Sequence, residues 1–323
     1  MRASSVSLVA SLALAATTSF AGCTLASSPS SPSLAYEGCS GAGCSTALSD
    51  HAVANGGTAT IVAGSSAQVF KVTSSDESIF TAGAGSGGLF SNGFVYVTGH
   101  SPGNATLTVY DSATHVYASA TVTVANVSRI ALDAGVSTSG VKVIPGHFAL
   151  HATTIGSRGE VLAGDGAIHF GPAGVLHGDT SASSCEGDCV GFSVTGPGAG
   201  SVEINAIGAT MTLPVESIDP ATIDALSFTT GSISAVVGGV GGALYSLSTK
   251  GEHVWGDAIS CTSDNPSIAK VEDGGLEAIS TFASGVSASL TIVGVAVGNT
   301  TLRCTVGSAT ASIAMAISPA SSH

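Results

Sequence analysis

The chain has 323 residues, of which 44% are hydrophobic and only 9% charged, and its formal net charge is -13. The eight Lys and Arg residues are scattered singly, so the sequence has no basic patch of the kind that binds nucleic acid or anionic lipid. The many Gly, Ala, Ser, Thr and Val residues are typical of a β-sheet protein with a buried core. Beyond the N-terminal leader, residues 1–22, no apolar run reaches the ~20 residues that a membrane-spanning helix needs.

Residues 1–22 have the pattern of an export leader. Arg2 precedes an uncharged apolar run, Val6–Ala16, which small residues follow. Cleavage after Ala21 would leave Cys23 as a free thiol near the N-terminus. Alternatively, Phe20-Ala21-Gly22-Cys23 resembles a bacterial lipoprotein lipobox, with Phe20 where leucine is usual. The resemblance implies that Cys23 is diacylated on sulfur and becomes the new N-terminus.

The cysteine count favours lipidation over simple secretion. Seven cysteines leave one unpaired in an exported protein, and lipidation of Cys23 explains both the odd number and its position. Thr24, in place of an aspartate after Cys23, resembles lipoproteins that are released to the outer membrane. Residues 23–48 are rich in Ser, Pro, Ala and Gly, which predicts a flexible tether. Within it, Cys39 and Cys44 are predicted to form a local disulfide, which is favoured over a metal site because no His lies nearby.

From residue 49 onward, short β-like runs alternate with Gly, Pro, Asn and Asp turns. Phe94–Thr98 and Ala105–Tyr110 show the period of a half-buried strand. Only Pro220–Leu226 has the features of a helical turn. Short strands at regular spacing predict β-sandwiches.

An internal repeat divides this region into modules. Gly103–Val109 recurs as Gly298–Cys304, and more loosely as Gly198–Ile204. Upstream of the first and last copies, Val72–Ile79 matches Cys261–Ile268 in the same order. Three copies predict three modules.

The two repeated motifs, Ser-Ser-Asp-x-Ser-Ile and Pro-Gly-Asn-Ala-Thr-Leu, resemble those of bacterial immunoglobulin-like domains of the group 2 kind. The resemblance implies small β-sandwiches that serve as spacers or adhesion modules and have no catalytic residues. The expected all-β organisation is a lipoprotein signal peptide (1–22), a tether (23–48), an immunoglobulin-like sandwich (49–126), a second, weakly matching sandwich (127–218), a third immunoglobulin-like sandwich (219–318) and a tail (319–323).

Alignment of the repeats also predicts a disulfide. Cys261 falls where Val72 lies in the first module, and Cys304 falls where Val109 lies. Both cysteines therefore replace apolar core residues on two different strands, and a buried Cys261–Cys304 bridge is expected. The remaining cysteines, Cys185 and Cys189, are predicted to pair locally.

The histidines of the second module could be metal ligands rather than ordinary surface residues. His147 and His151 share one face of a strand, and His177 with Cys185 and Cys189 could complete a zinc site. However, strand residues four apart lie ~13 Å from each other, too far to share one ion. Surface histidines are the favoured interpretation, and neither a metal nor a cofactor is predicted.

Catalytic motifs are missing from the sequence. It contains no Gly-x-Ser-x-Gly, no His-Glu-x-x-His and no Gly-x-x-x-x-Gly-Lys pattern. Sugar binding would require aromatic platforms, for which the lone tryptophan, Trp255, and nearby Tyr245 are the candidates. A single tryptophan in such a sandwich more often fills the core.

The sequence as a whole predicts a non-enzymatic, lipid-anchored cell-envelope protein that acts as a structural spacer or adhesion module, held to the outer membrane by its acyl anchor. An envelope glycan or another surface protein is the expected partner, and nucleic acid is not. The alternative is a surface protein that binds carbohydrate or a small ligand. A hydrolase with a site built from distant residues is a third, weaker hypothesis.

Overall fold

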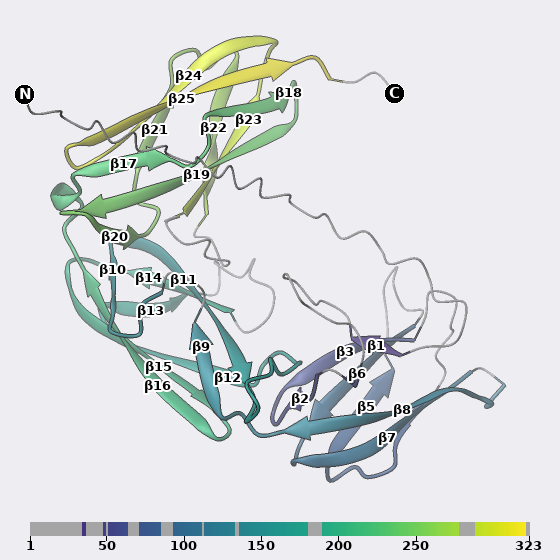
Figure 1. Ribbon diagram of the computed structural model, residues 1–323. Helices are drawn as coiled ribbons and strands as arrows, with labels where there is room; N and C mark the ends of the chain where they lie inside the picture. Colours follow the sequence, from purple (N-terminus) through teal and green to yellow (C-terminus); the bar gives the residue numbers. More distant parts are fainter. Residues whose placement is uncertain are drawn as a thin grey trace, which may run out of the picture.

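The computed structural model describes residues 34–36, 48–49, 51–63, 71–84, 93–111, 113–132, 136–179, 189–277 and 288–320. The expected export leader and four cysteines, Cys23, Cys39, Cys44 and Cys185, lie outside this part of the chain. The described elements are β-strands apart from one 3₁₀ turn, so the predicted all-β fold is confirmed (Figure 1). That turn, Pro220–Thr222, lies within the stretch expected to be helical, and the Asp219 carboxylate accepts a hydrogen bond from the backbone N–H of Ala221.

The first sandwich consists of two four-stranded sheets, β1-β3-β6-β5 and β2-β8-β7-β4. Its strands are β1 (Ala35–Tyr36), β2 (Val53–Ala54), β3 (Thr58–Val62), β4 (Lys71–Ser74), β5 (Phe80–Ala84), β6 (Phe94–Gly99), β7 (Gly103–Tyr110) and β8 (Val116–Ala125).

The second sandwich repeats this arrangement with the sheets β9-β11-β14-β13 and β10-β16-β15-β12. Its strands are β9 (Arg129–Leu132), β10 (Val141–Val143), β11 (Gly146–Ile155), β12 (Ile168–Gly174), β13 (Leu176–Asp179), β14 (Cys189–Val194), β15 (Gly198–Ala206) and β16 (Ala209–Ser217).

The third sandwich has the sheet β18-β25-β24-β21, which faces strands β17, β19, β23 and β22, and β20 pairs with β19 on the edge opposite β17. Its strands are β17 (Ala225–Phe228), β18 (Ser232–Val236), β19 (Val240–Thr249), β20 (Glu252–Trp255), β21 (Ser260–Ser263), β22 (Ala269–Glu277), β23 (Ala288–Gly294), β24 (Gly298–Val306) and β25 (Ala309–Ser318).

All three sandwiches share the strand order of immunoglobulin domains. One sheet pairs the first, second, fifth and fourth strands, and the other pairs the third, sixth and seventh strands. In each, a second short segment of the first strand crosses over and pairs in parallel with the last strand, as β2 does with β8 and β18 does with β25. The expectation of tandem immunoglobulin-like sandwiches is therefore confirmed by the strand pairing itself.

Alternation of small apolar and polar residues builds each core. In β25 the buried residues Ile313, Met315 and Ile317 alternate with exposed residues, because successive side chains of a strand point to opposite faces. Three separate clusters of buried side chains result, one within each sandwich.

The prediction of a flexible tether over residues 23–48 is wrong for the residues of that stretch that the structure describes, 34–36 and 48. Ala35–Tyr36 pairs with β3, where Tyr36 lies opposite Ile61 and is 5% exposed. Leu48 is also buried in the first core. Burial raises the pKa of the Tyr36 hydroxyl above its usual range. A strand of two residues is too short to show periodicity, and it forms here because β3 offers it a free edge.

Candidate functional site

The predicted Cys261–Cys304 disulfide is confirmed. The two cysteines lie directly opposite each other on the neighbouring strands β21 and β24, with their Cα atoms 4.1 Å apart. Cys304 is fully buried, and Cys261 packs against the same core. In the first sandwich, Val72 and Val109 are partners in the equivalent register. The bridge therefore joins adjacent strands of one sheet.

The other two predicted disulfides and the predicted lipidation of Cys23 are not tested by the described residues. Cys189 takes part in a disulfide, and its predicted partner, Cys185, lies outside the described ranges. Lipidation of Cys23 and the Cys39–Cys44 bridge likewise fall outside them. These assignments stay predictions.

Trp255 and Tyr245, the candidate aromatic platforms, are both buried, so the favoured expectation that the lone tryptophan fills a core is confirmed and the ligand-binding alternative is wrong. Trp255 is 2% exposed and Tyr245 is fully buried, so neither ring offers a face to a ligand in solution. They also belong to different cores, Trp255 to the second sandwich and Tyr245 to the third. The Tyr245 hydroxyl donates a hydrogen bond to the carbonyl oxygen of Gly256 at 3.2 Å. Its pKa is raised, first by burial and then by the negative charge of Asp257.

The histidines of the second sandwich do not gather into a metal site. His147 and His177 lie on either side of Ser193 in one sheet, and His151 lies opposite Cys189. Within the described ranges, no group of three His, Cys, Asp or Glu side chains is arranged to hold an ion. His147 instead contacts the third sandwich, where its Nδ1 lies 2.8 Å from Oδ2 of the buried Asp257.

A shallow depression of about 310 Å³ lies on the outer face of the β18-β25-β24 sheet. It is lined by small and neutral residues, Ser232, Asn299, Thr300, Thr301, Ala314, Met315 and Ala316. These side chains include no acid, base or thiol, so the lining supplies no general acid or base and nothing that would activate the hydroxyls of Ser232, Thr300 and Thr301 as nucleophiles.

The most elaborate polar arrangement lies where the second and third sandwiches meet. Strand β10 pairs in parallel with β16 of its own sandwich and with β20 of the next one. One sheet of nine strands therefore runs through both sandwiches (Figure 1). Because backbone hydrogen bonds close this junction, the angle between the two sandwiches is constrained as in a single sheet.

Side chains are exchanged across the same junction. Trp255, at the end of β20, packs into the core of the second sandwich, and Ile144, just after β10, packs into the core of the third. The backbone N–H of Ile144 donates to the carbonyl oxygen of Trp255 at 3.0 Å. Asp257 adds a second link, since its Oδ1 accepts the backbone N–H of His147 at 2.8 Å.

An exposed ion pair lies at the rim of this junction. The Lys142 ammonium donates a hydrogen bond to the Glu252 carboxylate and lies 3.9 Å from Glu216. The hydrogen bond to Glu252 is the main reason that the pKa of Lys142 is raised, and the same contact lowers the pKa of Glu252. Such exposed pairs contribute little to stability, so the backbone pairing and the exchanged side chains hold the junction.

Backbone hydrogen bonds also join the first and second sandwiches, here through isolated bridges rather than through a shared sheet. The backbone N–H of Ala54 donates to the carbonyl oxygen of Ala163 at 2.8 Å, and Ala163 donates to Ala52 at 2.7 Å. Thr58 and Asp165 exchange two backbone hydrogen bonds, each of 2.9 Å. A separate small core, Ala52, Ala54, Val127, Leu162 and Ala167, fills the space between these segments.

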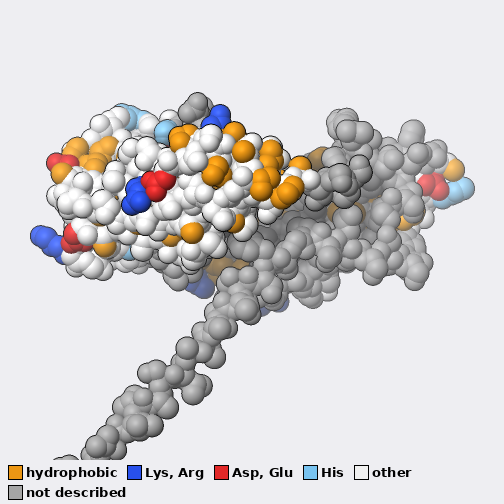
Figure 2. All heavy atoms as spheres, turned by 90° about the horizontal axis from the view of Figure 1, so that it is seen from above, with side chains coloured by type: hydrophobic (Ala, Val, Ile, Leu, Met, Phe, Trp, Pro, Cys, Tyr) orange, Lys and Arg blue, Asp and Glu red, His pale blue; other side chains and the backbone are white. Residues whose placement is uncertain are grey.

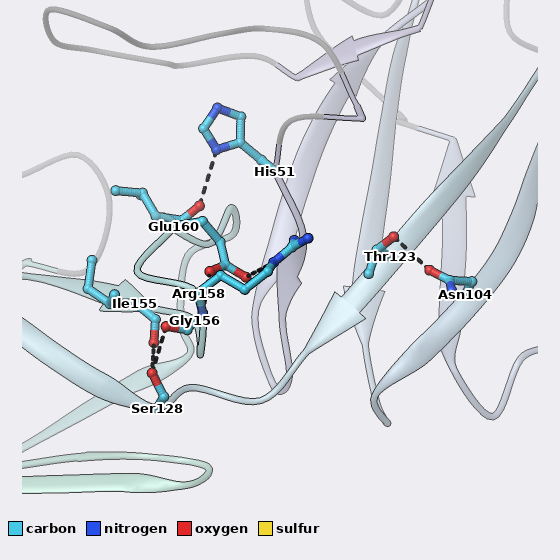
Figure 3. Close-up of polar contacts among 9 residues, drawn as sticks. His51, Asn104, Thr123, Ser128, Ile155, Gly156, Arg158 and Glu160 are labelled. Carbon is cyan, nitrogen blue, oxygen red and sulfur yellow. Dashed lines mark hydrogen bonds and ion pairs between the residues drawn. The ribbon is translucent and has the colours of Figure 1, made fainter.

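The His51 side chain reaches across this first junction, and polar side chains on either side hold the link between the two sandwiches in place (Figure 3). The Nδ1 of His51 lies 3.1 Å from the carbonyl oxygen of Val161, on the loop of the second sandwich that carries Arg158 and Glu160. The Ser128 hydroxyl lies at hydrogen-bond distance from two successive carbonyl oxygens of that sandwich, 3.0 Å from Ile155 and 2.7 Å from Gly156. Nearby, the Asn55 amide donates to the side-chain oxygen of Asn126 at 3.0 Å.

The two junctions share one register. Val53 pairs in parallel with Ala163, and Val143 pairs in parallel with Trp255. In both cases, the short segment that pairs with the last strand of one sandwich, β2 or β10, also bonds to the next sandwich. Its partner there is the segment that follows the long second strand: Ala163 after β11, or β20 after β19. The sequence did not reveal this shared backbone pairing of the two junctions, because the repeated motifs lie on other strands. The available signals were weak and local, for example Gly146, where a Cβ atom would collide with Asp257.

None of the helices in the described part of the chain is long and apolar enough to cross a membrane.

Comparison with known proteins assigns no family. No family model matches the chain, and no curated protein matches it. Among solved structures, it is similar to domains 4–9 of the surface layer protein SbsC, with 14% identity over 82% of this chain and 43% of that one and a TM-score of 0.31. It is also similar to the Escherichia coli adhesin FdeC, with 13% identity over 91% and 99% of the two chains and a TM-score of 0.23. The I9–I11 tandem of titin matches with 11% identity over 84% and 97%, also with a TM-score of 0.23. Scores this low decide neither family nor function, so the fold assignment rests on the strand order of the chain itself.

Proposed function

We propose that this chain is a non-enzymatic, lipid-anchored protein of the bacterial cell envelope, and that its three sandwiches form a structural spacer or adhesion module. The observation that supports this role best is the repeated junction, in which successive sandwiches bond through their backbones in one register. A protein that holds a surface at a set distance needs joints of this kind, because domains that touch only through small or polar interfaces move relative to each other.

A substitution at the first junction tests the spacer role. Gly208 has a φ of 102°, and a Cβ atom there would lie 2.5 Å from the carbonyl oxygen of Val127, in the link between the first two sandwiches. We expect Gly208→Ala to broaden the distribution of distances between spin labels on those sandwiches, as measured by double electron–electron resonance. Gly159→Ala is the matched control, because Gly159 has a φ of 84° and a Cβ atom there would meet no other atom within 4 Å. Equal distance distributions in the two variants would contradict the idea that close packing at Gly208 fixes the two sandwiches relative to each other.

The anchor is tested separately on cells. Cells grown with an alkyne fatty acid are expected to label the wild-type chain and to leave Cys23→Ser unlabelled, because the acylated sulfur is absent. The Cys23→Ser chain should also move from the membrane fraction to the soluble exported fraction. A labelled Cys23→Ser chain would refute the lipid anchor. Retention of a defined glycan by the purified chain on an array would instead favour a carbohydrate-binding protein.

A further inference from the structure

Four exposed valines lie together at one end of the third sandwich. Val236, Val240, Val295 and Val297 are 41%, 66%, 43% and 58% exposed, and they come from the end of β18, the start of β19 and the turn between β23 and β24. Figure 2, which looks down on this sandwich, shows hydrophobic side chains gathered along one side. We call these four residues the terminal valine patch.

The backbone beneath this patch repeats that of the first junction, bond for bond. Gly238 donates to the carbonyl oxygen of Gly294 and Gly239 donates to that of Val236, at 2.8 and 2.9 Å. In the first sandwich, the equivalent bonds run from Gly56 to Gly99 and from Gly57 to Ala54, both at 2.9 Å. Val236 therefore occupies the place of Ala54, and Val240 occupies the place of Thr58.

These equivalent places are covered in the other two sandwiches. Ala54 is fully buried and donates its backbone N–H to Ala163 of the second sandwich, and Thr58 is bonded to Asp165. Ile144 holds the same place in the second sandwich, where it donates to Trp255 of the third. Val236 and Val240 thus hold places that a neighbouring sandwich contacts at the first junction. Val295 and Val297 extend this surface at places whose equivalents in the first sandwich, His100 and Pro102, are exposed.

The strand beside the patch also presents an open edge. β18 lies at the end of its sheet, and the N–H of Val237 points inward to the carbonyl oxygen of Ser318 at 3.0 Å. Since successive N–H groups of a strand point to opposite sides, the N–H of Val236 points toward the open edge. β18 reads Ser-Ile-Ser-Ala-Val and lacks the lysines and prolines that usually protect such an edge.

Charge narrows the choice of occupant. The chain carries a net charge of -13, yet residues 225–249 and 278–302 contain no Asp, Glu, Lys or Arg. The exposed Lys270 lies two strands away from Val240, opposite Val293, while the four valines themselves offer a neutral, apolar surface that a second copy would match with an identical one. A two-fold axis through the patch would bring two β18 edges together in antiparallel orientation, as a closed dimer requires.

We propose that two copies of this chain associate through the terminal valine patch, with β18 of each copy pairing at its open edge. The inference rests on the proposed adhesive role for its setting at the cell surface, where it names a second copy as the partner. The dimer itself is measured in solution, so its failure is distinguishable from failure of the lipid anchor.

The test is sedimentation equilibrium of the full exported chain with Cys23→Ser, a background that excludes acyl-driven micelles and a Cys23–Cys23 disulfide. We expect a weak, reversible dimer with a dissociation constant in the micromolar range. Val240→Glu and Val297→Glu should each weaken it roughly a hundredfold, because the two-fold axis places the new carboxylates close together. Val116→Glu is the matched control, since Val116 is 59% exposed on the first sandwich, and it should leave the dimer unchanged.

Each outcome decides the proposal. A chain that stays monomeric at every concentration overturns self-association and leaves the patch to a different protein. A dimer that survives both glutamates forms through another surface and overturns the assignment, and so does a dimer that Val116→Glu abolishes equally. Thermal melts of all variants should match that of the Cys23→Ser chain, because each substituted side chain is exposed.

Discussion

Replacing both Cys261 and Cys304 with valine should lower the thermal midpoint of the third sandwich by roughly 8–30 °C. The bridge closes a loop with a sequence separation of 43 residues, and a disulfide across such a loop stabilises by about 2–4 kcal/mol. In a domain of this size, each kcal/mol shifts the midpoint by about 4–8 °C. Differential scanning calorimetry of the full chain measures the shift. Hydrogen exchange of β21 and β24 then assigns it to the third sandwich.

The first sandwich supplies the control for this prediction. Its residues at the equivalent positions, Val72 and Val109, already form a valine pair in the same register. The double valine variant therefore retains apolar packing and loses only the covalent link. The reverse change, Val72→Cys with Val109→Cys, should form a bridge and raise the midpoint of the first sandwich. An unchanged midpoint in the double valine variant would show that the disulfide does not stabilise the fold.

Trp255→Ala should destabilise the second sandwich, although Trp255 belongs to a strand of the third. Its side chain is 2% exposed within the core of the second sandwich. Truncation of a buried tryptophan costs about 3–5 kcal/mol through lost contacts and the cavity left behind. Hydrogen exchange measured by mass spectrometry should show the largest loss of protection in β11, β14 and β15.

Ile144→Ala is the reciprocal variant. Ile144 follows β10 of the second sandwich, yet it is fully buried in the core of the third. Its truncation should cost about 2–5 kcal/mol, mainly in the third sandwich. Leu290→Ala serves as the control, since Leu290 lies on β23 of the third sandwich and packs only in that sandwich's core. If Trp255→Ala lowered protection only in the third sandwich, as Leu290→Ala should, the exchange of side chains across the junction would not be energetically significant.

The repeated motifs predicted the disulfide because they align residues on strands of the same kind. Val72 and Cys261 occupy equivalent strands, as do Val109 and Cys304, so equivalent positions face each other in both sandwiches. Alternation along a strand is a local property, and it identified the apolar positions correctly. The motifs do not reveal whether the two cysteines lie on the same sheet or on opposite sheets. The structure shows that they lie on neighbouring strands of one sheet.

Trp255 and Tyr245 are buried, as favoured for the tryptophan, but the sequence did not reveal which core each ring enters. The two rings are ten residues apart on strands that pair with each other, yet they point into different cores. Their separation depends on the position of β20, which lies between β19 of its own sandwich and β10 of the previous one. No property of either aromatic residue reveals that arrangement.

The sequence by itself determined the all-β class, the order of repeated modules and the Cys261–Cys304 pair, because periodicity and internal repetition record local strand structure. Only the tertiary structure decided that β1 joins the first sandwich and that both junctions share one register. It also decided that Trp255 packs in the core of the second sandwich and Ile144 in the core of the third. The physical reason is that backbone N–H and C=O groups form the junctions. Every residue but proline carries both groups, so their pairing across distant segments leaves almost no trace in the side chains.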